Sequence, residues 1–227
     1  MRLKNLIIGD MRFQYKYGFY LVYAIIVILY ACIIFAIPES IRKKVALIMI
    51  LTDPAAMGLF FMGAILMLEK SERVLNTIAV TPVKTSEYVI SKAISISIIS
   101  ILVGLTLGLI SGNRNILGIL IGTLFGSVIF TMVGLFIAIH TNSLNSFLIG
   151  TVPMELIFFI PAILYLFGFK NDFMLLHPSC AIMQLYMGIT NQAMICILVC
   201  IAWTLIVLRI TCKSLEKMMK QIGGIKL

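Results

Sequence analysis

The feature that most constrains this chain is a long run without charge: residues 115–154 contain no Asp, Glu, Lys or Arg. Most of the run is apolar, and a helix that crosses a membrane needs about 20 apolar residues. The run is therefore long enough for two crossings, and the polar segment His140–Ser146 divides it. Apolar runs recur along the rest of the chain, so the pattern predicts a protein embedded in a membrane.

The composition excludes the common soluble classes. Of the 227 residues, 61% are hydrophobic and 12% are charged, and the mean hydropathy is +1.11. A soluble domain has about 45–50% apolar and about 25% charged residues. So few charges cannot solvate a compact soluble fold, which rules out a soluble enzyme and a disordered protein. The apolar runs are continuous and do not alternate with polar residues, so the predicted spans are helices and not barrel strands.

Six apolar runs predict an all-α membrane protein with six transmembrane helices. The predicted spans are Tyr17–Ile37, Val45–Leu68, Tyr88–Ile110, Ile116–Ile139, Phe147–Phe169 and Gln192–Leu208. Thr52-Asp53-Pro54 interrupts the second span, and a short re-entrant or interfacial helix is expected between Lys170 and Gln192. The remaining loops are too short for a second domain of ordinary size. Residues 1–227 are therefore predicted to form a single transmembrane domain.

Lysine and arginine gather on one side of the predicted membrane when both termini are placed in the cytoplasm. Thirteen of these cations then lie inside: Arg2, Lys4, Arg12, Lys16, Lys70, Arg73, Lys84, Lys92, Arg209, Lys213, Lys217, Lys220 and Lys226. Five lie outside: Arg42, Lys43, Lys44, Arg114 and Lys170. This bias fits the positive-inside rule and predicts a multi-pass protein of the cell (plasma) membrane. The net charge of +9 is then explained by topology and contact with membrane lipids, with no nucleic acid as partner. The abundance of Ile, Lys and Asn suggests a bacterial source.

The two ends of the chain are both basic. Residues 1–16 are predicted to form an interfacial elbow helix, because Leu3, Ile7 and Met11 recur at helical spacing with basic residues on the other face. The alternative is a plain anchored terminus. Residues 209–227 are predicted to form a basic cytoplasmic tail.

One charge-rich loop joins the second and third spans. Val74, Leu75 and Ile78 form an apolar stripe at helical spacing. Pro82 breaks or restarts the helix, because proline disfavours helix in the residue before it. Residues 69–84 are therefore predicted to contain a short amphipathic helix, which either lies on the membrane or inserts its stripe into a groove of another protein.

This loop resembles the corresponding loop of type 2 ATP-binding-cassette (ABC) exporter permeases. The shared residues are Glu69, Lys70, Leu75, Ile78, Val80, Thr81, Pro82, Val83, Glu87, Tyr88 and Lys92. Arg73-Val74 stands where that family usually has Gly-Thr before the helix. The segment Thr52–Gly58 and the run up to Lys70 look like the small branch of fluoroquinolone export permeases.

The resemblance implies a transport subunit that is not an enzyme and holds no cofactor. Its loop would be a coupling helix seated in an ATP-binding subunit, present in two copies, and a second permease chain, identical or homologous, would complete the path. The residues implied in coupling are Glu69, Lys70, Glu72, Arg73, Val74, Leu75, Ile78, Thr81 and Pro82. ATP and Mg would belong to the partner, because this sequence contains no G-x-x-x-x-G-K-[ST] loop to hold phosphate.

Small amphiphilic compounds, such as drugs or antibiotics, are the expected substrates, because the outer loops are short. Two alternatives stay open: a stand-alone membrane immunity or binding protein that sequesters a peptide or lipid, and an ABC exporter of a peptide or lipid-linked substrate. An intramembrane enzyme is a third, but the sequence contains no hydrolase or membrane-protease motif. His140 and His177 are far apart, and Cys196 and Cys200 lack a His or carboxylate beside them, so no metal site is predicted.

Two carboxylates within the predicted spans are candidates for the substrate path or for gating. An ionisable side chain inside a membrane is costly and by default indicates function. Glu155 can contact a cationic substrate, or it can lie near an interface or pair with His140. Asp53, which precedes Pro54, can act in gating or cap a helix break.

Glycines recur four residues apart in two spans. They are Gly104 and Gly108 in the third span, and Gly118, Gly122 and Gly126 in the fourth. Such spacing lets helix backbones approach closely in lipid. The glycines are therefore predicted either to pack helices within one bundle or to form a seam with a second chain.

Overall fold

The computed structural model describes residues 2–79, 81–188 and 191–222. Within these ranges the chain is almost entirely helical and contains no β-strand. In chain order the elements are α1 (Arg2–Lys16), α2 (Phe19–Ala36), α3 (Glu39–Ile50), a π-helical turn (Leu51–Ala55), α4 (Met57–Ser71), α5 (Val74–Ala79), α6 (Thr85–Ile110), α7 (Ile116–Ile139), α8 (Leu144–Leu166), a 3-10 turn (Asp172–Leu176), α9 (Pro178–Met187) and α10 (Ala193–Ile222).

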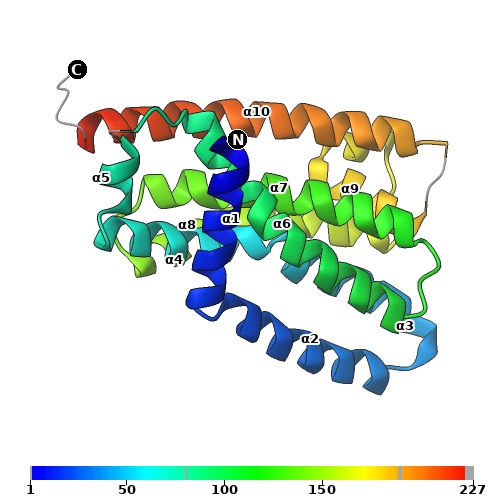
Figure 1. The fold of residues 1–227 in the computed structure, drawn as a ribbon. Helices are drawn as coiled ribbons and strands as arrows, with labels where there is room; N and C mark the ends of the chain where they lie inside the picture. Colours follow the sequence, from blue (N-terminus) through cyan, green and yellow to red (C-terminus); the bar gives the residue numbers. More distant parts are fainter. Residues whose placement is uncertain (1, 80, 189–190, 223–227) are drawn as a thin grey trace.

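Six helical segments of the described chain are long and apolar enough to cross a membrane. They are Phe19–Ala36, Glu39–Ser71, Thr85–Ile110, Ile116–Ile139, Leu144–Leu166 and Ala193–Lys220. They confirm the prediction of an all-helical, multi-pass membrane protein with six spans. Figure 1 shows α1 crossing the long helices at a steep angle. The membrane-surface position expected for residues 1–16 stays a prediction.

The second span is longer than predicted, because the charged residues before it are helical. It begins at Glu39, directly after Pro38. The predicted interruption at Asp53-Pro54 is a π-helical turn, Leu51–Ala55, inside the span. Proline removes one backbone donor, and the wider turn accommodates this loss without ending the helix.

The last span also continues beyond its predicted end. α10 runs to Ile222 without a break, so residues 209–222 of the predicted basic tail are helical. Its cations Arg209, Lys213 and Lys217 are exposed. Residues 223–227, with Lys226, lie outside the described residues.

α7 is the central helix of the bundle. It packs against α4, α6, α9 and α10, and most of its residues are buried. Two glycines allow α4 to approach it closely: a Cβ atom added at Gly134 would lie 2.6 Å from the Gly58 carbonyl oxygen. Polar groups inside the bundle find partners, as where the hydroxyls of Ser100 in α6 and Ser127 in α7 lie 2.9 Å apart.

The glycines predicted from sequence spacing all lie at contacts inside the chain. Gly104 and Gly108 of α6 face α7. The three on α7 face α9 or the π-helical turn: Gly118, Gly122 and Gly126. These contacts support the packing alternative, whereas a seam with a second chain stays a prediction.

A buried helix lies between the last two spans. All residues of α9 from Pro178 to Tyr186 are buried, and the helix packs against α7, α8 and α10. Asn115, at the start of α7, donates through Nδ2 to the carbonyl oxygens of Leu185 and Tyr186 at 2.6 and 3.2 Å. The structure therefore contains the short helix expected in this segment and embeds it in the bundle, whereas its depth in the membrane stays a prediction.

The outside of the bundle is formed largely by α2, α8 and α10. In the most apolar 18-residue stretch of each helix, only 17% of the residues of α2 and 22% of those of α8 and α10 are buried, compared with 61% in α7. The exposed side chains of these three helices are mostly Leu, Ile, Val and Phe. Such faces are suited to lipid or to another membrane chain.

Candidate functional site

α5 is a short helix at the end of the bundle where α4 ends and α6 begins (Figure 1). Arg73, with a φ of 57°, turns the chain from α4 into it. Leu75 is 1% exposed, and Val74 and Ile78 are half-buried. α5 packs against α10 and α4, so the apolar stripe expected to enter a partner lies largely within the chain itself.

The outer side of α5 and its flanks is polar. Its exposed residues include Glu72, Arg73, Asn76, Thr77, Thr81 and Pro82. The Thr81 hydroxyl donates to the Ile78 carbonyl oxygen at 2.7 Å and satisfies a backbone group at the end of α5. This face is the part of the predicted coupling segment that another protein can reach.

Glu69 lies in a buried ion cluster. Lys92 of α6 is 2% exposed, and its ammonium group contacts the Asp10 carboxylate of α1 at 2.6 Å and the Glu69 carboxylate of α4. The Tyr88 hydroxyl donates to the other oxygen of Glu69. One buried cation is thus shared between two carboxylates, which joins α1, α4 and α6.

The spacing of the cluster residues explains how α1 docks on α6. Asp10 and Gln14 are four residues apart on α1, and Lys92 and Ser95 are three apart on α6, so each pair shares one helix face. Gln14 Nε2 donates to Ser95 Oγ at 2.9 Å, next to the ion pair. The Phe13 ring between them on α1 lies 5.9 Å from the Lys92 ammonium group.

The N-terminal helix also reaches both flanks of α5. Tyr17, just after α1, donates its hydroxyl to the Glu72 carboxylate. The Arg2 guanidinium donates to the Pro82 carbonyl oxygen at 3.1 Å. The hydrogen bond to Glu72 raises the pKa of Tyr17, with smaller effects from burial and from the carboxylate charge. The phenol therefore keeps the proton that it donates.

Lys70, the residue after Glu69, anchors α4 to a different helix. Its half-buried ammonium group donates to the carbonyl oxygens of Ala138 and Thr141 at 3.4 and 3.3 Å. These carbonyls lie at the C-terminal end of α7, where a cation satisfies free acceptors and opposes the negative end of the helix dipole. The two motif residues thus fix the end of α4 in place from two sides.

Sequence reasoning missed Asp10, Gln14 and Ser95. Asp10 is the one acidic residue before Glu39, and a lone acid in a basic segment is the signal that could have found it. Tyr88 and Lys92 belong to the loop motif, yet only the structure gives them partners.

The two candidate carboxylates lie elsewhere. Asp53 is in the π-helical turn, and its Oδ2 atom is buried without a hydrogen-bond partner among the described residues. Tyr23 and Tyr30 of α2 lie within electrostatic reach of it. Glu155 is half-buried on α8. Neither residue belongs to the ion cluster, so their roles in a substrate path or in gating stay predictions.

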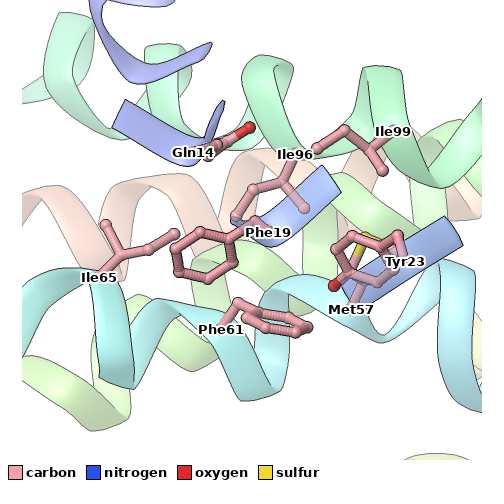
Figure 2. Close-up of a pocket in the computed structure, with 8 residues that line it drawn as sticks. All are labelled: Gln14, Phe19, Tyr23, Met57, Phe61, Ile65, Ile96 and Ile99. Carbon is pink, nitrogen blue, oxygen red and sulfur yellow. The ribbon is translucent and has the colours of Figure 1, made fainter. Parts of the chain in front are cut away.

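A small pocket lies where α1 and α2 cover α4 and α6 (Figure 2). Phe61 packs against Phe19 and Tyr23, with ring centroids 5.0 Å apart in both pairs. Gln14 lies at one side of the pocket, and none of the eight residues drawn in Figure 2 is charged. The pocket is therefore a packing junction that holds α2 to the bundle. Across the described residues, no three His, Cys, Asp or Glu side chains gather as metal ligands.

Six apolar spans, with α7 at the centre of the bundle and one short polar-faced helix at its end, define a multi-pass membrane protein. Comparison with protein families identifies the family: the fluoroquinolones export permease protein family matches residues 1–222. The chain belongs to this family, which confirms the resemblance found in the loop and in the second span.

Two curated proteins are similar to this chain. Both are named fluoroquinolones export permease protein, and they come from two strains of Mycobacterium tuberculosis. Each is 24% identical to the chain over 155 residues. The alignment covers 67% of this chain and 65% of each relative, so the chain matches just under two thirds of their length.

Proposed function

We propose that this chain is the membrane-spanning subunit of an exporter that is driven by ATP hydrolysis in a separate subunit. Family membership supports the role in export, and the names of the relatives suggest fluoroquinolones or similar small amphiphilic drugs as substrates. The chain itself binds no ATP in this proposal and needs no cofactor. Mg and ATP are held by the partner.

The observation that carries the proposal is the way α5 is held. Its polar side is exposed, while its other side packs on α10 and α4. α4 and α6, the helices before and after it, share the buried cation of Lys92. A partner that moves α5 would therefore move α4 and α6 together, because α5 is not a loose loop between them.

The predicted coupling residues divide into two groups under this proposal. Exposed residues contact the ATP-binding subunit, and they include Glu72, Arg73, Thr81 and Pro82. Buried or half-buried residues hold α5 in position instead: Glu69, Lys70, Val74, Leu75 and Ile78. This division differs from a coupling helix that inserts its apolar stripe into the partner.

The assembly is proposed to contain two permease chains, identical or homologous, and two ATP-binding subunits, in a bacterial plasma membrane. Both termini lie in the cytoplasm, on the side of α5, because the larger share of Lys and Arg lies there. The apolar outer faces of α2, α8 and α10 offer the surface for lipid and for the second chain.

The test is co-expression of the full chain with an ATP-binding subunit encoded beside it, followed by co-purification and ATPase assay. Asn76→Glu/Thr77→Glu places two charges on the exposed side of α5, where a central interface residue is worth about 1–2 kcal/mol or more. We expect stimulated ATPase activity or recovery of the partner to fall about tenfold or more.

The matched control is Ser40→Glu/Asn191→Glu, which adds the same charge at exposed positions of the opposite end. This control should leave the complex and its activity unchanged. If the α5 variant behaves like the control, α5 does not couple the subunits. If no ATP-binding subunit associates with the wild-type chain, a stand-alone membrane binding protein replaces the exporter. Peptide or lipid-linked substrates that stimulate ATPase activity in place of drugs would correct the substrate class alone.

A further inference from the structure

A basic groove lies at the end of the bundle opposite α5. The start of α3, the loop between α6 and α7, and the ends of α8 and α9 surround an open cavity of about 380 Å³. Figure 1 shows these segments at the end away from α5. Lys43, Lys44 and Arg114 all contribute to its walls. Five cations are predicted to lie on the outer side of the membrane, and three of them therefore line one groove.

Among the residues that the structure describes, no carboxylate pairs with the cations of the groove. Glu39, the carboxylate nearest in sequence to the two lysines, pairs with Arg42 at 3.8 Å. Across the described residues, Lys43, Lys44 and Arg114 form no ion pair of their own. Lys44 lies 5.7 Å from the centre of the Phe167 ring, which carries no charge.

The floor of the groove is apolar, and hydrogen bonds hold its edge. Leu47 of α3 and Leu166 of α8 are each 5% exposed and line it. Asn115 lies at its edge, where its amide is fixed by the α9 carbonyls of Leu185 and Tyr186 and its oxygen accepts from the Gly118 amide. The cations thus stand around a preformed hollow that has an apolar side, unlike lysines scattered over a surface.

The depth of the groove matches the lipid headgroups. Lys43 and Lys44 lie in the first turns of one span, Arg114 lies between two spans, and Leu166 ends a fourth. Span ends lie at the membrane–water boundary, where phosphate groups gather. Three cations at this level attract the negative charge of a phosphate headgroup, and the attraction is stronger at a partly buried site than in bulk water.

We propose that this groove binds the phosphate headgroup of an anionic phospholipid, with the first part of the acyl chains over Leu47 and Leu166. A free phosphate ion carries the same negative charge but has no apolar part to contact the floor. The lipid is therefore the occupant that fits both the cations and the apolar floor. The assignment does not depend on ATP coupling.

The test measures thermal unfolding of the full chain in detergent with a thiol-reactive dye, which reports exposure of the buried cysteines Cys180, Cys196 and Cys200. Phosphatidylglycerol, phosphatidylcholine with the same acyl chains, or inorganic phosphate is added. We expect phosphatidylglycerol to raise the unfolding midpoint and the other two to leave it unchanged. Native mass spectrometry measures the affinity in parallel.

The groove variant is Lys43→Gln/Lys44→Gln/Arg114→Gln. A cation near the membrane surface contributes about fivefold to binding of anionic lipid, so loss of three should weaken phosphatidylglycerol binding roughly a hundredfold. The matched control is Arg209→Gln/Lys213→Gln/Lys217→Gln, which removes the same residue types from exposed positions on α10. The control should bind phosphatidylglycerol as the wild type does.

Three results would overturn the proposal. They are an equal shift with phosphatidylcholine, an equal loss of binding in the control, or a shift produced by inorganic phosphate but not by phosphatidylglycerol. The wild-type comparison of the three additives decides the question even if the groove variant fails to fold. In that case the charge-conserving variant Lys43→Arg/Lys44→Arg/Arg114→Lys must keep the preference for phosphatidylglycerol.

Discussion

The Lys92 side chain carries a charge into a site where only 2% of the residue is exposed. Such a charge is tolerated because Asp10 and Glu69 both contact it and Tyr88 donates to Glu69. Removing one partner of a buried pair costs far more than replacing the whole group by apolar or neutral residues. The cluster therefore behaves as a unit, and its parts cannot be assessed one at a time.

Lys92→Met is expected to destabilise the fold strongly, because it leaves two carboxylates buried without their cation. The loss should be about 3–5 kcal/mol in the free energy of unfolding. The triple variant Asp10→Asn/Glu69→Gln/Lys92→Met removes all the charges and should recover most of this loss. Thermal unfolding in detergent measures both. Equal stability of the single and triple variants would show that the ions are not buried as described.

At the scale of helices, the contact between α4 and α7 leaves very little space in the bundle. The Gly134 position faces backbone atoms of Gly58 and Leu59 at 2.6–2.8 Å from an added Cβ. Backbone atoms cannot rotate away as a side-chain tip does. The two helices therefore have no room for even one methyl group at this crossing.

Gly134→Ala is expected to lower stability by about 1–3 kcal/mol, the usual cost of overpacking a core, although alanine favours helix. Gly9→Ala is the control, because Gly9 lies in α1 with open space around its Cβ position. That change should stabilise the chain by about 0.5–1 kcal/mol through helix propensity alone. The same thermal unfolding assay separates them, and two shifts of the same sign would refute the close crossing.

The number and type of the spans could be predicted from the sequence, because a long uncharged apolar run in a membrane forms a helix and few other structures are possible for it. Their ends could not. The second span begins at Glu39 and the last continues past Leu208, because Lys and Arg side chains near helix ends, such as Lys43 and Arg209, can reach the membrane surface. A criterion based on apolar runs excludes such residues. Asp53-Pro54 predicted an interruption of the second span, whereas the structure accommodates the proline in a π-helical turn within that span.

The helical pattern of the candidate site could also be predicted from the sequence, but the contacts that its residues make with other helices could not. Leu75 lies on the predicted apolar stripe, but no single sequence tells whether such a stripe packs against α10 or against a partner. The pair of Asp10 and Lys92 joins residues 82 positions apart. Its geometry depends on the docking of α1, which no local pattern encodes.

The whole molecule has two ends of different character, one with α5 and the other with the basic groove. If the predicted orientation is correct, α5 faces the cytoplasm and the groove faces outward. The bias of Lys and Arg supports this orientation, and accessibility of single cysteines can measure it directly.

In a variant without Cys32, Cys180, Cys196, Cys200 and Cys212, we expect Ser40→Cys and Arg73→Cys to report opposite sides. A membrane-impermeant maleimide added to intact cells should label Ser40→Cys, because Ser40 is exposed at the groove end. Arg73→Cys, at the α5 end, should be labelled only after the membrane is permeabilised. The reverse pattern would invert the topology.

The salt bridge of Asp10 with Lys92 also dictates an order of events during synthesis of the chain. When α1 leaves the ribosome, the lysine that it needs is 82 residues away and has not yet been made. The N-terminal helix therefore cannot form this contact until the chain has been synthesised as far as Lys92, in the third span. Docking of α1 on α6 therefore follows synthesis of the first two spans, although α1 is the first helix to be made.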